Sequence, residues 1–128
     1  MNDEPLAIER LAEKVRAALQ SADLDAYREL LDPAVRWGPP GDQVSGCHSR
    51  DEVLAWYRRG HASGVRADVV ETVVIQDKIL VGLKVRSSAA APESGGELSR
   101  WQVLTVVDGR VKDIRGFEER ATAVDHMR

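Results

Sequence analysis

The hydrophobic positions of the chain change their spacing once, near Val65. Before this point, apolar residues recur every three or four positions, as on the buried face of an amphipathic helix. After it, they recur at about every second position, as in strands that bury one face. This order predicts helices in the first half of the chain and a run of strands in the second, which is an α+β fold.

Two consecutive helices are predicted at the start of the chain. The segment from Leu6 to Gln20 carries a continuous apolar stripe at helical spacing. Ser21 to Leu31 reads as a second helix, which either Ser21 or Asp23 can cap. Asp32-Pro33 ends this helix, because proline disfavours helical backbone in the residue before it.

A short strand and a third helix follow. Ala34 to Trp37 is a strand candidate, and glycine and proline residues stop it. Ser49 to Ala62 is predicted to be helical, with Val53 among its apolar residues. Ser49 and Glu52 have the spacing of a capping box, in which each side chain bonds a backbone N–H that the helix leaves free.

The second half of the chain reads as strands joined by turns and one longer loop. Turns are predicted at Asp77-Lys78 and, more strongly, at Asp108-Gly109. The small, polar segment Ser87 to Glu97 is predicted to be a mobile loop, and Ala121 to His126 adds a helical turn. The predicted strands run from Val65 to Ile75, Ile79 to Val85, Leu98 to Val107 and Val111 to Glu118.

Length and composition indicate one domain over residues 1–128. Hydrophobic residues make up 43% and charged residues 30%, which suits a packed core and a hydrated surface. The net charge of −3 favours neither nucleic acid nor an anionic membrane as a partner. Cys47 is the only cysteine, and neither a signal peptide nor a membrane-length apolar run is evident, so we expect a cytoplasmic protein.

The last predicted strand holds a possible acid–base pair. Simple alternation places Val111, Asp113, Arg115 and Phe117 on one face, which we expect to be the cavity wall. There Arg115 would keep Asp113 ionised or orient a substrate carbonyl or carboxylate. The alternative is an ion pair in solvent with no function.

Aromatic side chains are the candidate ligand contacts. Trp37, Trp56, Tyr57 and Trp101 are four of the six aromatic residues, and Phe117 lies on the predicted cavity face. Aromatic walls suit a flat apolar ligand with a few polar anchors. Alternatively, these residues are the core of a small barrel.

His48 is a candidate general base, since it lies beside a segment that could border a pocket. The three histidines lack the spacing of metal ligands, and Cys47 next to His48 does not form a metal motif. A glycine-rich phosphate loop and a nucleophile elbow are also absent from the sequence. We therefore expect neither a metal nor a cofactor.

Two further strand positions remain open. In simple alternation, Glu71 falls on the same face of its predicted strand as apolar residues. It is therefore either a proton carrier with a raised pKa or a residue at a dimer contact or strand edge. Arg100 and Gln102 alternate with Trp101 and Val103, and only one of these pairs can face inward. Alternation alone does not decide which.

Three segments together resemble the SnoaL-like branch of the nuclear transport factor two-like superfamily: DLDAYRELLDPAVRW, SRDEVLAWY and DGRVKDIRGFEERATA. They cover nearly the whole chain in the order that this branch shows. The resemblance implies a cone-shaped barrel of a strongly bent mixed or antiparallel sheet, packed on three N-terminal helices. It also implies a pocket at the open end, chemistry without a cofactor and, often, a homodimer across the outer face of the sheet.

The resemblance leaves several functions open, because such relatives include polyketide cyclases, ketosteroid isomerases, limonene epoxide hydrolases, dehydratases and non-catalytic binding or scaffold proteins. The first hypothesis is a cofactor-free isomerase, cyclase or hydratase-like enzyme acting on a small apolar carbonyl compound. Asp113 or His48 would then move the proton and Arg115 would stabilise negative charge.

The second hypothesis is a ligand-binding protein or dimeric scaffold without catalysis. SnoaL-like cyclases often carry an acid in the last strand, and the matching position here is Gly116, which favours this alternative. A third hypothesis, an epoxide hydrolase, needs an Asp-Arg-Asp arrangement. Asp113 and Arg115 supply two of its members, and the sequence offers no evident second aspartate.

Overall fold

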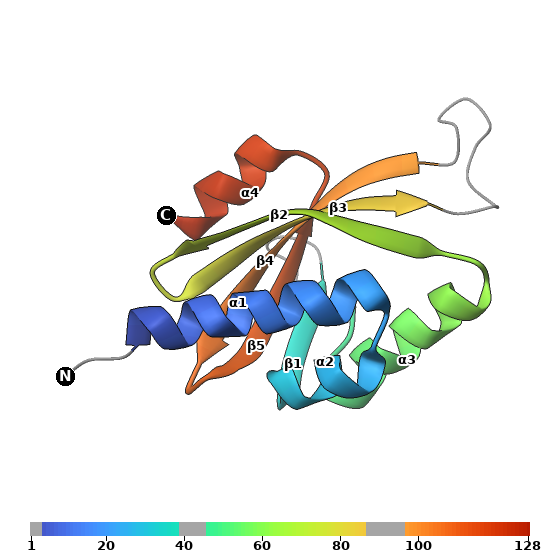
Figure 1. The fold of residues 1–128 in the computed structure, drawn as a ribbon, viewed down its shortest axis with the longest axis horizontal. Coiled ribbons are helices and arrows are strands. Elements are labelled where there is room, and N and C mark those ends of the chain that lie inside the picture. The colour runs from blue at the N-terminus through green and yellow to red at the C-terminus, as the bar shows by residue number, and fades with distance from the viewer. Residues whose placement is uncertain (1–3, 39–45, 87–96) are drawn as a thin grey trace.

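The computed structural model of the chain describes residues 4–38, 46–86 and 97–128 (Figure 1). Within these residues, helices and strands follow one another in the predicted order. The elements are α1 (Glu4–Ser21), α2 (Leu24–Leu30), β1 (Leu31–Gly38), α3 (Arg50–Ala62), β2 (Arg66–Ile75), β3 (Lys78–Arg86), β4 (Glu97–Val107), β5 (Arg110–Phe117) and α4 (Arg120–Met127). The predicted loop Ser87–Glu97 lies outside the described residues except for Glu97, which begins β4.

The five strands form one mixed sheet in the order β1-β5-β4-β3-β2. β1 runs parallel to β5, and the other neighbouring strands are antiparallel. The α+β class and the cone-like arrangement are therefore confirmed. Among the described strands the sheet is open, with β1 and β2 as its two edges, so the expected barrel does not close.

Helices cover both faces of the sheet (Figure 1). The inner face packs on α1, α2 and α3, and Val81, Leu104 and Ile114 belong to its fully buried core. The outer face carries α4, and its smaller core includes Leu80 and Val103. The short C-terminal segment, predicted as a helical turn, is thus an eight-residue helix that covers a second hydrophobic cluster.

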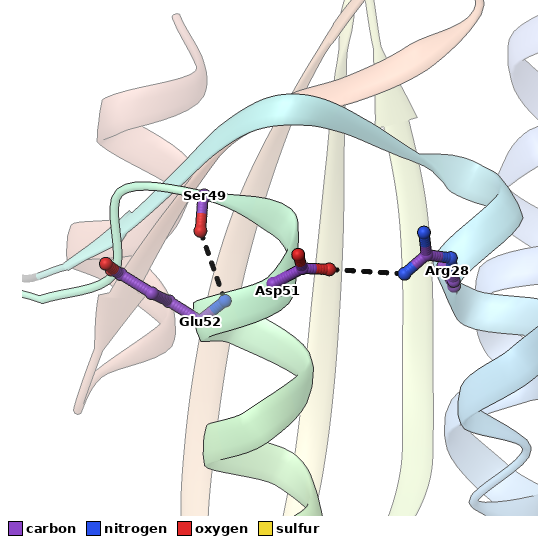
Figure 2. Close-up of polar contacts among 4 residues, drawn as sticks. All are labelled: Arg28, Ser49, Asp51 and Glu52. Carbon is purple, nitrogen blue, oxygen red and sulfur yellow. Dashed lines mark hydrogen bonds and ion pairs between the residues drawn. The ribbon is translucent and has the colours of Figure 1, made fainter.

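Side-chain caps fix the starts of two helices. Asp23 caps α2, because its Oδ1 accepts a hydrogen bond from the Ala26 backbone N–H at 3.1 Å. Ser49 Oγ accepts from the Glu52 N–H at 3.2 Å, as the capping box predicts (Figure 2). The Glu52 carboxylate accepts from the backbone N–H of His48 at 2.7 Å, one residue before the expected partner.

A surface ion pair joins α2 to α3. Arg28 and Asp51 approach to 3.2 Å across the gap between the two helices (Figure 2). Both side chains are exposed, so the pair contributes at most about 1 kcal/mol. The packing of the two helices therefore depends mainly on their buried apolar residues.

The two hairpin turns match the predictions to different degrees. Asp108 and Gly109 form the turn between β4 and β5 with φ values of 52° and 80°, the left-handed pair of a type I′ turn. The turn between β2 and β3 consists of Gln76 and Asp77 instead of Asp77-Lys78. Lys78 already belongs to β3, because the strand register pairs it with Ile75.

Candidate functional site

A hollow of about 1610 Å³ opens at one end of the inner face, where α1 ends, β2 and β4 begin, and β3 and β5 end. Helix α3 supplies much of one side. The volume exceeds the range of about 300–1,000 Å³ that is usual for small-molecule sites. The residues lining the hollow include Leu19, Trp37, Tyr57, Leu83, Gln102 and Gly116.

Three aromatic side chains form one wall of the hollow, which we call the aromatic wall: Trp37, Trp56 and Tyr57. The Trp37 ring stacks on Tyr57 at 5.1 Å and meets the edge of Trp56 at 4.6 Å. Reciprocal backbone hydrogen bonds with Cys47, of 2.9 and 2.7 Å, hold Trp37 at the end of β1. Half of Trp56 is exposed, so this wall offers apolar surface to a ligand.

A polar pair lies beside the aromatic wall. Gln102 on β4 is only 6% exposed, and its Nε2 donates to the Tyr57 hydroxyl at 3.3 Å. The Gln102 Oε1 and the hydroxyl of the fully buried Tyr27 have no hydrogen-bond partner among the described residues. Burial raises the pKa of Tyr57 and, more strongly, that of Tyr27, so both hydroxyls stay protonated at neutral pH.

The carboxylates around the hollow are exposed or half-buried, and in the described structure none of them bonds to Tyr57 or Gln102. They are Glu52, Asp68, Glu118 and Glu119. Glu52 accepts from a backbone N–H of the α3 cap, and Asp68 pairs with Arg86 at 2.9 Å. Within residues 4–38, 46–86 and 97–128, no three His, Cys, Asp or Glu side chains are grouped to hold a metal ion.

The predicted acid–base pair forms, but away from the hollow. Arg115 donates from Nε and Nη2 to the two carboxylate oxygens of Asp113, both at 2.9 Å. The pair lies on the outer face, where Arg115 is opposite Val103, and neither residue lines the hollow. The expected position in the cavity wall is therefore wrong, and their catalytic role stays a prediction that this position does not favour.

A bulge in β5 explains the wrong face assignment. Thr105 pairs with Asp113, but the next residue, Val106, pairs with Val111, so Lys112 is the extra residue. An extra residue reverses the alternation of side chains between faces. Val111 therefore belongs to the inner core, whereas Asp113 belongs to the outer face.

The third predicted catalytic residue, His48, is exposed at the start of α3 and is not among the residues lining the hollow. Its backbone N–H is part of the helix cap. Its role as a general base also stays a prediction. The structure thus does not bring His48, Asp113 and Arg115 together in the hollow.

The remaining two predicted ligand contacts, Trp101 and Phe117, border the hollow but pack against the outer-face cluster. Gln102 faces inward and Val103 outward, which settles the alternation that the sequence left open. Sequence reasoning did not select Gln102 as a site residue. The sequence feature that could have identified Gln102 is a single amide side chain in the mostly apolar second half of β4.

Glu71 lies on the outer face, where both of its carboxylate oxygens accept from Arg120 of α4 at 2.9 Å. These hydrogen bonds lower its pKa, so the alternative in which Glu71 is a proton carrier with a raised pKa is wrong. The Arg120 guanidinium also lies 6.0 Å from the ring centroid of Trp101. Glu71 is therefore a residue that attaches α4 to the sheet.

The family model of the SnoaL-like domain matches residues 12–114, which is most of the chain. The chain belongs to the SnoaL-like domain family. No curated protein matches it. None of the helices in the described part of this SnoaL-like protein has both the length and the apolarity needed to cross a membrane.

Solved structures of other proteins share the fold. Bal32a, from a soil-derived mobile gene cassette, is 22% identical, with a TM-score of 0.70 over 94% of this chain and 98% of that one. A candidate ketosteroid isomerase from Kribbella flavida is 20% identical, with a TM-score of 0.69 over 87% and 76%. An epoxide hydrolase of Mycobacterium tuberculosis resembling limonene epoxide hydrolase is 17% identical, with a TM-score of 0.62 over 92% and 86%. At these identities the likeness establishes the fold alone.

Proposed function

We propose that this SnoaL-like protein binds a small, largely apolar molecule in the hollow. In this proposal the function of the protein is to bind the molecule and not to convert it. The observation that carries the proposal is the aromatic wall beside the polar pair of Tyr57 and Gln102. Flat apolar surface with a few polar groups is the usual composition of a small-molecule site. Among the described residues, the polar pair is not hydrogen-bonded to a carboxylate or histidine that could move a proton. Association into a homodimer stays a prediction.

A calorimetric titration with naphthalene and with N-methyl-2-quinolone tests this proposal, since both are flat and uncharged. We expect both to bind the wild-type protein. Replacing Trp37 by alanine should weaken binding by about tenfold, because the ligand loses a stacked aromatic surface. Val70→Ala is the matched control, since Val70 is 55% exposed and does not line the hollow. Failure of both compounds to bind, or equal affinity in Trp37→Ala, would contradict the proposal.

Catalysis on a carbonyl compound is the second candidate function. The observation that favours it is the neutral, deeply placed Tyr57 hydroxyl, which could stabilise negative charge on a carbonyl oxygen. Solution NMR in D₂O would show whether the protein accelerates deuterium exchange next to the carbonyl of α-tetralone. We expect no acceleration over buffer. Exchange that depends on the Tyr57 hydroxyl, and is lost in Tyr57→Phe, would put catalysis first.

A further inference from the structure

The polar pair of Tyr57 and Gln102 is an incomplete hydrogen-bonding unit. A glutamine amide offers donors and a carbonyl acceptor, and a tyrosine hydroxyl offers one donor and also accepts. Here the Gln102 amide nitrogen donates to the Tyr57 oxygen, and the Gln102 Oε1 has no partner. The bond from Gln102 uses a lone pair of the Tyr57 oxygen and leaves the proton of that hydroxyl out of the contact. One donor and one acceptor thus remain available side by side.

This conclusion does not depend on how the amide is turned. If the oxygen and nitrogen of Gln102 exchange places, Tyr57 donates to the carbonyl oxygen. The amide nitrogen then becomes the available donor, and a lone pair of the Tyr57 oxygen becomes the available acceptor. In both orientations the pair presents one donor next to one acceptor.

The burial of the pair makes the missing partners informative. Gln102 lines the hollow, and only 6% of its surface is exposed. Nearly all buried polar atoms in folded proteins have a partner, so an unpartnered one at a hollow points to a group that is supplied from outside. Tyr27, whose ring meets Tyr57 edge-on at 5.6 Å, places a second buried hydroxyl beside that of Tyr57.

The chemistry of the pair selects the ligand. Neither Tyr57 nor Gln102 is charged, and no ionised side chain of the described structure bonds to them. A charged ligand group would lose its hydration there without a counter-charge. The stacked ring of Trp37 next to Tyr57 favours a planar molecule.

We infer that the hollow selects a neutral, planar molecule that carries a hydrogen-bond donor directly beside an acceptor, as in a lactam, an amide or a hydroxy-carbonyl compound. The inference rests on the proposed function, because it specifies the ligand class of the same site. The donor of the ligand contacts the free acceptor of the pair, and its acceptor contacts the free donor. A compound that lacks either group leaves a buried polar atom unpaired.

Three probes of similar shape test the inference. In 2-quinolone an N–H lies beside a C=O, N-methyl-2-quinolone keeps only the acceptor, and naphthalene has neither group. We expect the wild-type protein to bind 2-quinolone about tenfold more tightly than either of the other two probes. In Gln102→Leu and in Tyr57→Phe this preference should disappear, while naphthalene still binds. Thr105→Val, on β4 but away from the hollow, should keep the full preference.

The outcomes separate the two proposals. Equal affinity for all three probes would overturn the inference and leave the proposed function standing. Absence of binding by every probe would overturn both. A preference that survives in Gln102→Leu and Tyr57→Phe would also overturn the inference, since the pair would not be its source.

The stability of the free variant provides a second readout. Gln102→Leu removes a buried oxygen that has no partner but also the hydrogen bond to Tyr57, so the two effects should nearly cancel and its melting temperature without ligand should lie close to that of the wild type. A clearly lower melting temperature would mean that the amide is already satisfied in the free protein, which would overturn the inference. If this variant does not fold, Tyr57→Phe alone decides the probe test.

Discussion

The two faces of the sheet treat their polar groups in opposite ways. On the outer face, Asp113 is paired with Arg115 and Glu71 with Arg120, each through two hydrogen bonds of 2.9 Å. On the inner face, the Gln102 Oε1 is buried without a partner beside the hollow. The polar groups of the outer face satisfy one another, whereas the unsatisfied group of the inner face lies where we propose that a ligand binds. Charged residues in a strand are therefore weaker evidence of a site than an unpartnered neutral amide.

The glycines of the sheet show the same contrast in packing. A Cβ atom added to Gly82 on the outer face would overlap the ring of Trp101, with its Cε3 at 2.8 Å. A Cβ added to Gly116 would have Trp37 Nε1, at 4.0 Å, as its nearest neighbour. The outer face is thus closely packed over Gly82, whereas the inner face is open at Gly116.

The largest effect is expected from a matched pair of glycine replacements. Gly82→Ala should lower the free energy of unfolding by about 1–3 kcal/mol, because the new methyl group displaces Trp101. Gly116→Ala should change it by less than about 1 kcal/mol, since the methyl group enters open space. Urea denaturation of both variants measures the difference. Similar losses in the two would contradict the contrast between the faces.

An intermediate effect is expected at the outer-face ion pair. Asp113→Ala should lower the free energy of unfolding by about 1–2 kcal/mol, because Arg115, whose side chain is 8% exposed, loses its bidentate partner. The affinity for 2-quinolone should not change, as the pair does not line the hollow. Asp51→Ala, which breaks the exposed pair with Arg28, should cost less. A loss of binding in Asp113→Ala would restore the sequence-based hypothesis for this residue.

The smallest effect is a pH-dependent one at the attachment of α4. The hydrogen bonds from Arg120 lower the Glu71 pKa below its ordinary 4.5, so the ionised carboxylate stabilises the fold. This stabilisation is complete above about pH 5 and is lost as the pH falls through the lowered pKa. The melting temperature of Glu71→Gln should lie slightly below that of the wild type at neutral pH, and the gap should close in acid.

The effect at Glu71 should be small because both partners are partly exposed. Glu13→Gln, which removes another surface carboxylate, is the control for the general influence of acid. A gap between the wild type and Glu71→Gln that stays constant down to pH 3 would contradict the assignment.

Much of the fold followed from local patterns. The third helix begins at its Ser49 cap, and the turn at Asp108-Gly109 lies where predicted, because capping and turn geometry depend on neighbouring residues alone. Trp37, Trp56 and Tyr57 were candidate ligand contacts, but the sequence left open whether they line a cavity or form a core, and the structure places them along the hollow. Gln102 was not selected, because its importance lies in a missing partner.

The sequence by itself determined the order of helices and strands, because hydrophobic period and turn residues act over short distances. The resemblance to the SnoaL-like family followed from three segments of the sequence. Only the tertiary structure decided which side chains face the hollow. One extra residue at Lys112 moves Asp113 and Arg115 to the outer face, and the pairing of β5 with β4 sets the position of that bulge. A register between strands depends on the whole sheet, which is why alternation along one strand could not reveal it.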